Sequence, residues 1–250
     1  IEFMQTHFYN YTDFENIGGN QNPELIIDTI AGDNANKTPI FDQVKTMEIE
    51  VKDENDNIVI HKLYYEVLRE GSRDNPTVAD SVFVSYKGLL LDNKIFDQRK
   101  SPIWLEAKNV VRGFQEFLPK IKRGSIKINA DGTYQFDNFG IAFAIFPSGL
   151  GYYNNGTGNI KPYSPLIFQV NLLTLNRTDH DNDTVLTVFE DINGEVIYFG
   201  KPYPPAYNLS ADTKNKKVLC IGDNLNTDIK GANIQNYDSL FITSGVHREQ

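Results

Sequence analysis

The chain of 250 residues has a single cysteine, Cys220. One cysteine cannot form an internal disulfide, and it excludes a zinc site built from several thiolates. No apolar run approaches the roughly 18 residues that a membrane-spanning helix needs. Basic residues are also in deficit, because 24 Lys and Arg face 33 Asp and Glu, for a net charge of -9. That balance argues against nucleic acid as a partner, since binding to phosphates needs a basic face.

The acidic excess is confined to one part of the chain. Residues 195–250 contain six acidic and six basic side chains, whereas residues 1–194 contain 27 acidic and 18 basic ones. Hydrophobic residues make up 40% of the sequence and charged residues 23%, close to the usage of ordinary globular proteins, so a packed core can form. We predict two segments of different character that meet near Gly194.

The N-terminal quarter, residues 1–62, is expected to form an arm followed by a hairpin. The arm contains turn-forming clusters and one short apolar run at 25–27. Apolar and polar residues then alternate over 47–51 and again over 58–60, around the polar segment 53–57. Alternation with a period of two on both sides of a turn predicts an antiparallel hairpin.

Residues 63–176 are expected to form the main domain, made mostly of strands. Apolar residues recur at three- and four-residue spacing over 109–120, which predicts one short helix with an apolar face. Strands are predicted at 64–68, 82–91, 103–105, 141–146 and 166–175, with a further hairpin across 124–139. Many short strands with a single helix predict an α+β fold, in which an antiparallel sheet packs against the helix.

Five short motifs follow one another in this domain. They are Val84-Ser85-Tyr86-Lys87-Gly88, Phe96-Asp97, Val110-Val111-Arg112-Gly113-Phe114, Pro147-Ser148-Gly149-Leu150-Gly151-Tyr152 and Ile160-Lys161-Pro162-Tyr163-Ser164-Pro165-Leu166-Ile167-Phe168. In order and spacing they resemble the FKBP family of peptidyl-prolyl cis/trans isomerases, over about residues 64–175. The resemblance implies a bent antiparallel β-sheet around one short helix. It also implies a folding helper that acts on X–Pro bonds of proline-containing polypeptide clients.

The chemistry implied by this resemblance needs no metal, cofactor or nucleophile. Rotation about an X–Pro bond is opposed by a barrier of about 18–20 kcal/mol, because resonance gives the C–N bond double-bond character. The twisted amide has lost this resonance and is less polar. An apolar pocket therefore stabilises the transition state more than the ground state.

The resemblance also implies which side chains line the pocket. Phe114 would be the floor, where the family usually has Trp. Tyr86, Phe96 and Phe168 would be aromatic walls. Asp97 would hydrogen-bond near Tyr86 and face the carbonyl group that rotates.

The helix start and the long loop before the last strand would complete this pocket. Val110 and Val111 would lie at the helix start, where the Val111 N–H would donate to a substrate carbonyl. Tyr152 would donate its hydroxyl, and Ile160 would close the loop side. Trp104 is a further candidate for a wall.

A second class of function fits the same motifs: a catalytically weak FKBP-like module that docks on a larger assembly of the cell envelope. Phe114 is smaller than the usual Trp, and Tyr153 stands where the family usually has Gly. An open pocket floored by Phe114 would favour catalysis. A pocket filled by Tyr153 or by the N-terminal arm would favour docking.

An acidic loop, residues 177–194, follows the last predicted strand. Asp179, Asp181, Asp183 and Glu190 fit positions 1, 3, 5 and 12 of an EF-hand-type calcium loop. Ca²⁺ prefers six to eight oxygen ligands, which carboxylates supply. Position 6 is Thr rather than the usual Gly, and no flanking helix pair is predicted. A structural calcium site, a solvated linker and a phosphatase nucleophile motif formed by Asp181 and Asp183 are the three alternatives.

Residues 195–250 have the strand–turn–helix–strand pattern of a parallel α/β unit. Their motifs resemble the C-terminal part of haloacid-dehalogenase-like phosphatases. In that family a Lys steadies a phospho-aspartyl intermediate and acids bind Mg²⁺, positions that Lys201, Asp223 and Asp228 match. A complete phosphatase needs a nucleophile strand and further βα units upstream, where this chain has the FKBP-like segment. We therefore interpret the tail as a phosphatase-like fragment and a phosphatase as the less favoured function.

The expected location follows from the cysteine and the acidic loop. An FKBP-like segment without cysteine, next to a calcium-like loop, suits an oxidising and calcium-rich compartment. It also resembles bacterial cell-envelope FKBPs. We expect a periplasmic or cell-envelope protein, with the cytoplasm as the alternative.

Overall fold

The computed structural model describes residues 1–53, 55–177, 217–222 and 224–242. The chain divides into two compact units, Ile1–His180 and Asp181–Gln250. Each unit is considered by itself below.

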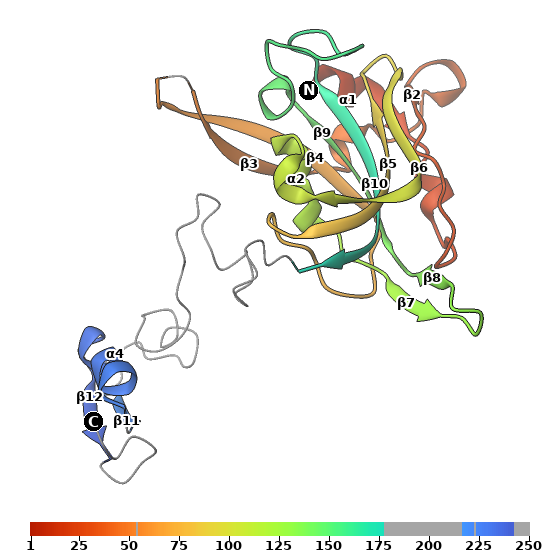
Figure 1. Ribbon diagram of the computed structural model, residues 1–250. Helices are drawn as coiled ribbons and strands as arrows, with labels where there is room; N and C mark the ends of the chain where they lie inside the picture. Colours follow the sequence, from red (N-terminus) through yellow and green to blue (C-terminus); the bar gives the residue numbers. More distant parts are fainter. Residues whose placement is uncertain (54, 178–216, 223, 243–250) are drawn as a thin grey trace. The chain divides into compact units, whose positions relative to one another are not determined.

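The first unit is built mainly from β-strands, with two short α-helices (Figure 1). Its elements in chain order are α1 (Glu2–Thr6), β1 (His7–Tyr9), β2 (Ile27–Thr29), β3 (Lys45–Lys52), β4 (Ile58–Arg69), β5 (Ser81–Leu89), β6 (Ile95–Glu106), α2 (Arg112–Phe117), β7 (Ser125–Ile128), β8 (Tyr134–Asp137), β9 (Gly140–Phe146) and β10 (Leu166–Asn176). This confirms the predicted α+β class.

A six-stranded antiparallel sheet in the order β3-β4-β9-β10-β5-β6 is the centre of this unit. The two strands in the middle of that order, β9 and β10, were predicted to be buried, and every residue of β9 is buried. Successive side chains of a strand point to opposite faces of its sheet. Phe168 of β10 therefore packs in the same cluster as Phe114 and Phe117 of α2, whereas the neighbouring Ile167 packs in a separate cluster on the other face.

The N-terminal arm covers that other face of the sheet. Its buried residues include Tyr9 and Leu25, which pack in one cluster with Phe143 and Ile167 of the two central strands. The Gln169 side chain fixes the arm to β10, because its Oε1 accepts from the Leu25 N–H at 2.8 Å and its Nε2 donates to a backbone carbonyl of the arm. Burial on both faces explains why β9 is continuously apolar and why β10 has apolar residues on both of its faces.

The predicted arm and hairpin, residues 1–62, and the predicted main domain, residues 63–176, lie together in one compact unit. The strands predicted at 58–60 and 64–68 form one long strand, β4, which pairs with β3 on one side and β9 on the other. The predicted hairpin itself is confirmed, and its tip extends from the sheet (Figure 1).

The predicted helix is present but shorter than residues 109–120. Helix α2 spans Arg112–Phe117, and a 3-10 turn continues it through Lys120. Val110 and Val111 have extended backbone angles, which suits β-branched residues. Pro119 lies in the 3-10 turn, where its missing N–H and its ring prevent a regular α-helical continuation.

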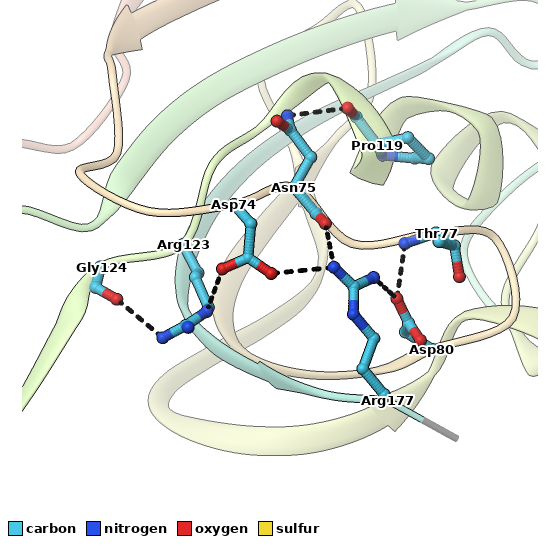
Figure 2. Close-up of polar contacts among 8 residues, drawn as sticks. All are labelled: Asp74, Asn75, Thr77, Asp80, Pro119, Arg123, Gly124 and Arg177. Carbon is cyan, nitrogen blue, oxygen red and sulfur yellow. Dashed lines mark hydrogen bonds and ion pairs between the residues drawn. The ribbon is translucent and has the colours of Figure 1, made fainter. Parts of the chain in front are cut away.

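An ion-paired network holds the end of β10 (Figure 2). Arg177 donates to Asp80, which is 2% exposed, and to Asp74 at 2.8 Å. Arg123 donates to the other oxygen of Asp74, also at 2.8 Å. Asn75 donates to the Pro119 carbonyl, so the network joins the β4–β5 loop to the end of the helix.

The second unit, as far as it is described, is a small parallel α/β unit. Strands β11 (Leu219–Gly222) and β12 (Asp238–Phe241) pair in parallel, and a π-helical turn (Leu225–Ile229) followed by α4 (Lys230–Ile234) connects them. This confirms the strand–helix–strand pattern that was predicted from the sequence.

Candidate functional site

Four phenylalanine rings form the centre of the predicted pocket. Phe114, on α2, and Phe168, on β10, are 2% and 5% exposed, and their ring centroids lie 5.0 Å apart in an edge-to-face arrangement. Phe96 of β6 meets Phe168 edge to face at 5.3 Å, and Phe146 of β9 stacks on it at 5.8 Å. The floor and two of the three predicted aromatic walls are therefore in mutual contact.

Two glycines allow this close packing. A Cβ on Gly88 of β5 would collide with the Phe96 ring, and a Cβ on Gly113 of α2 would collide with the Phe146 ring. Both glycines lie within motifs that were singled out in the sequence. Because Gly disfavours helix by about 1 kcal/mol relative to Ala, the need to admit the Phe146 ring explains Gly113.

The third wall, Tyr86, brings a polar group to this apolar cluster. Its ring centroid lies 5.9 Å from that of Phe114, and its hydroxyl donates to Asp97 Oδ2 at 2.6 Å. Burial first, and then the bond to the Asp97 carboxylate, raise the pKa of Tyr86 well above its usual range, so the hydroxyl stays protonated. Arg99 lies 3.7 Å from the other carboxylate oxygen of Asp97. A charged acceptor is thereby held at the edge of an apolar surface.

The remaining predicted residues border the same cluster. Val110, Val111 and Tyr152 are half-buried and pack against it, and Ile160 is 6% exposed within it. Val111 immediately precedes α2, and the first amides of a helix have no acceptor within the helix. The structure thus brings together all nine residues that the sequence predicted, while their roles in binding and catalysis remain predictions.

Neither of the two groups expected to block the pocket lies in it. Tyr153 is 54% exposed and its ring contacts Tyr163 instead, with centroids 5.6 Å apart. The N-terminal arm packs on the opposite face of the sheet from α2. The two observations remove the main reason for preferring a docking module.

Trp104 does not line the pocket, contrary to one expectation. It pairs with Phe83 across β5 and β6, and the two rings lie 5.2 Å apart. Phe83 packs in the cluster formed by Phe14, Phe139 and others, away from Phe114. Side chains alternate along β5, so Phe83 lies on the opposite face of the sheet from Val84. Trp104 pairs directly with Phe83 and therefore lies on the same face as Phe83.

Sequence reasoning missed two members of the site. Phe146 ends the apolar run of β9, where nothing in the sequence distinguishes it from the other buried residues. Arg99 comes two residues after Asp97 on β6. Residues two apart on a strand point to the same face, and this spacing was the available signal that Arg99 lies beside Asp97.

The predicted calcium ligands Asp179, Asp181, Asp183 and Glu190 lie outside the described residues. In the part of the chain that the structure describes, no group of three or more His, Cys, Asp or Glu side chains could hold a metal ion. No helix within the described ranges is long and apolar enough to cross a membrane.

Of the phosphatase-like positions, Asp228 is described, whereas Lys201 and Asp223 are not. Asp228 is 8% exposed, and its Oδ2 accepts from the Asn224 N–H at 3.3 Å, next to the end of β11. Asn224 caps the following π-helical turn by accepting from two of its N–H groups.

The aromatic cluster, on a sheet that packs against one short helix, agrees with the FKBP-like fold inferred from the motifs. Residues 72–173 match the family model "FKBP-type peptidyl-prolyl cis-trans isomerase". That segment is an FKBP-type domain. Residues 198–250 match a second model, described as HAD-hydrolase-like, in agreement with the resemblance of the tail.

Curated relatives agree with the first of these matches. The peptidyl-prolyl cis-trans isomerase Mip of Coxiella burnetii is 33% identical over 120 residues, which cover 46% of this chain and 45% of that protein. The FKBP-type isomerase FkpA of Escherichia coli is 34% identical over 115 residues, 44% of this chain and 37% of that protein. The chain therefore matches less than half the length of these relatives. The crystal structure of FkpA from Escherichia coli overlaps 51% of each chain at a TM-score of 0.38 and 29% identity.

Proposed function

We propose that the first unit is a peptidyl-prolyl cis/trans isomerase of the FKBP type that helps proline-containing polypeptides to fold. The observation that carries this proposal is the Tyr86–Asp97 hydrogen bond at the edge of the cluster floored by Phe114. The family match over residues 72–173 and the two relatives named as isomerases support it.

The proposed mechanism uses the contrast between the apolar floor and the polar edge. A proline ring placed against Phe114 and Phe168 would leave water, which weakens the solvation that favours the planar, polar amide. The Val111 N–H and the Tyr152 hydroxyl would hold substrate carbonyls on either side. Asp97, kept in place by Tyr86, would face the carbonyl that turns. Each 1.36 kcal/mol removed from the barrier raises the rate tenfold.

Exchange NMR on a short X–Pro peptide tests this function. We expect the wild-type protein to accelerate cis/trans exchange, and we expect Asp97→Ala and Phe114→Ala each to reduce the acceleration by roughly tenfold or more. Asp92→Ala is the matched control, because Asp92 is paired only locally with Lys94 in an exposed turn. Circular dichroism would confirm that each variant is folded. A wild-type rate equal to the uncatalysed rate would leave only the docking function.

For the acidic loop we propose a structural calcium site formed by Asp179, Asp181, Asp183 and Glu190. Its support is the spacing of the four carboxylates in the sequence. The Thr at position 6 should weaken the site, because a β-branched residue resists the backbone angles of that turn. The affinity should then be on the order of 10⁻⁴–10⁻³ M, as in extracellular modules.

Calorimetric titration with Ca²⁺ tests this site. We expect binding heat for the wild-type protein at millimolar Ca²⁺ and its loss in Asp181→Ala. Lys94→Ala, remote in sequence from the loop, should titrate like the wild type. Heat that is absent from all three proteins would make the loop a linker.

We also propose a location in the periplasm or cell envelope, where a larger envelope assembly is a second partner besides the clients. The support is that residues 1–219 contain no cysteine that could form an unwanted disulfide in an oxidising space, and that the calcium-like loop suits a calcium-rich space. Fractionation of the source cells would decide the point, and recovery in the cytoplasm would refute it.

A further inference from the structure

A groove of about 520 Å³ lies between the β3–β4 hairpin and the loop that follows β9. We call it the hairpin groove. Its apolar and aromatic lining comes from Val51 and Val59 of the hairpin and from Tyr153 of the loop, with His61 and Gly149 between them. Polar residues also line it: Lys52, Asp53 and Asn55 of the hairpin and Asn154 of the loop. Binding sites commonly combine apolar and aromatic side chains with polar groups that fix the orientation of the ligand.

The groove and the isomerase site share one face of the sheet. Val51 and Val59 are directly paired across the hairpin, and Val51 packs against the same core cluster as Phe114 and Tyr152. The imidazole of His61 fills the space where a Cβ of Gly149 would lie, so the hairpin and the loop are in direct contact there. The groove residues Val51 and Val59 and the isomerase cluster are thus on the same face of the sheet.

One peptide segment serves both places. Tyr152 packs against the isomerase cluster, whereas the next residue, Tyr153, lines the groove. Tyr153 has a φ of +44° and its ring partner Tyr163 a φ of +62°, a backbone region that L residues with large side chains rarely adopt. The Tyr163 N–H donates to the Tyr153 carbonyl at 2.7 Å, which fixes this arrangement. Backbone strain of this kind gathers at functional sites.

We propose that the hairpin groove is a secondary subsite, which receives an apolar or aromatic side chain of the client that lies about three residues from the proline. The inference rests on the isomerase function proposed above and adds a specificity to it. The two places meet at the consecutive residues Tyr152 and Tyr153, and three residues of extended chain span roughly 10 Å. Clients with an aromatic residue at that distance would bind in two places and would be held with the X–Pro bond at the site.

The test compares the exchange rates of three peptides of equal length. One has Ala-Pro surrounded by Ala, and the other two carry Phe three residues before or three residues after the proline. Transfer of a Phe side chain from water into an apolar site favours binding enough to give about a tenfold difference in kcat/KM. We expect the wild-type protein to prefer at least one of the Phe peptides over the Ala peptide by about that factor.

The variants remove the groove without touching the isomerase site. Tyr153→Asn deletes the ring and keeps a residue that tolerates a positive φ, and Val59→Asn makes the hairpin side polar. Ile60→Asn is the matched control, because Ile60 is the next residue of β4, is 56% exposed and points to the opposite face. We expect both groove variants to reduce the preference to within about twofold while they keep the rate on the Ala peptide. The control should keep the full preference.

The outcomes separate the two proposals. Isomerase activity on all peptides without any preference for Phe, or a preference that survives in both groove variants, would overturn the subsite and leave the isomerase function standing. If no peptide is isomerised, binding is followed through the amide shifts of Val59, His61 and Asn154 in the wild-type protein. Shifts caused by a Phe peptide alone would then support the groove while the isomerase function fails, and no shifts would overturn both.

Discussion

At the scale of single residues, the site depends on where one carboxylate is held. Asp97 is half-buried and is contacted by Tyr86 at 2.6 Å and by Arg99 at 3.7 Å. The hydroxyl hydrogen bond fixes one oxygen, and the guanidinium of Arg99 approaches the other from the exposed edge of β6. Tyr86 remains a donor over the whole physiological range, because its pKa is raised by burial and by the neighbouring carboxylate. A positioned carboxylate therefore needs no metal ion to stay in place.

The carboxylate of Asp74 gives a prediction that depends on pH. Burial acts to raise the pKa of Asp74, but the bond to its own backbone and its contacts with Arg123 and Arg177 outweigh this and lower the pKa below its usual value. A lowered pKa in the folded state adds stability that is present above the unfolded pKa, near 3.9, and is lost as the pH falls through the folded pKa. We expect Asp74→Asn to be less stable than the wild type by roughly 1 kcal/mol at pH 7, because both ion pairs are partly exposed.

Urea denaturation at pH 7 and below pH 3 measures this effect. The difference between Asp74→Asn and the wild type should shrink as the pH falls, because the Asp74 carboxylate becomes protonated first in the unfolded state and then, at lower pH, in the folded state. Asp137→Asn is the control. Asp137 lies in the hairpin β7–β8 and is not part of the ion-paired network of Figure 2. A stability difference for Asp74→Asn that is the same at both pH values would contradict the argument.

At the scale of elements, the arm is part of the core. Leu25 is 1% exposed and packs under β10, whereas its neighbour Ile26 is 58% exposed. Removal of a buried Leu side chain costs about 2–5 kcal/mol, while surface substitutions usually change stability by less than about 0.5 kcal/mol. We expect Leu25→Ala to lower the free energy of unfolding by the larger amount and Ile26→Ala to leave it nearly unchanged.

Thermal or urea unfolding of the two variants compares neighbouring residues of one segment. The comparison is sharp because both residues are apolar and differ mainly in burial. Equal and small effects would mean that the arm detaches without unfolding the sheet. In that case the arm would not be a structural part of the first unit.

At the scale of the whole molecule, the chain joins an FKBP-type domain to a segment that matches a HAD-hydrolase-like model over residues 198–250. The strand–helix–strand arrangement of β11, α4 and β12 places Asp228 beside the end of β11. Phosphatases of the kind that the tail resembles also need a nucleophile strand and further βα units upstream. In this chain the FKBP-type domain occupies the sequence before the tail.

We therefore expect no phosphatase activity from Lys201 and Asp223. Incubation of the full chain with a generic phosphomonoester and Mg²⁺ should release phosphate at the background rate. Asp223→Ala should behave identically. Turnover by the wild type that disappears in Asp223→Ala would instead establish a catalytic tail.

The sequence by itself determined the elements whose signal is local. The alternation on both sides of residues 53–57 predicted the hairpin of β3 and β4, and the ordered motifs from Val84 to Phe168 predicted which side chains gather at the site. The parallel unit of the tail was likewise predicted from its strand–helix–strand pattern. In each case the residues that decide the structure are close in sequence or belong to one recurrent set of motifs.

Tertiary structure decided what depends on register and on contacts between distant segments. The register between β5 and β6 pairs Trp104 with Phe83, away from the pocket. Composition and spacing do not specify that register. The arm joined the sheet through contacts such as Leu25 with Gln169, 144 residues apart. Helix α2 was shortened because Val110 and Val111 remained extended, although their spacing fits an apolar helix face. Local patterns do not encode these choices, since they follow from which surfaces are buried together.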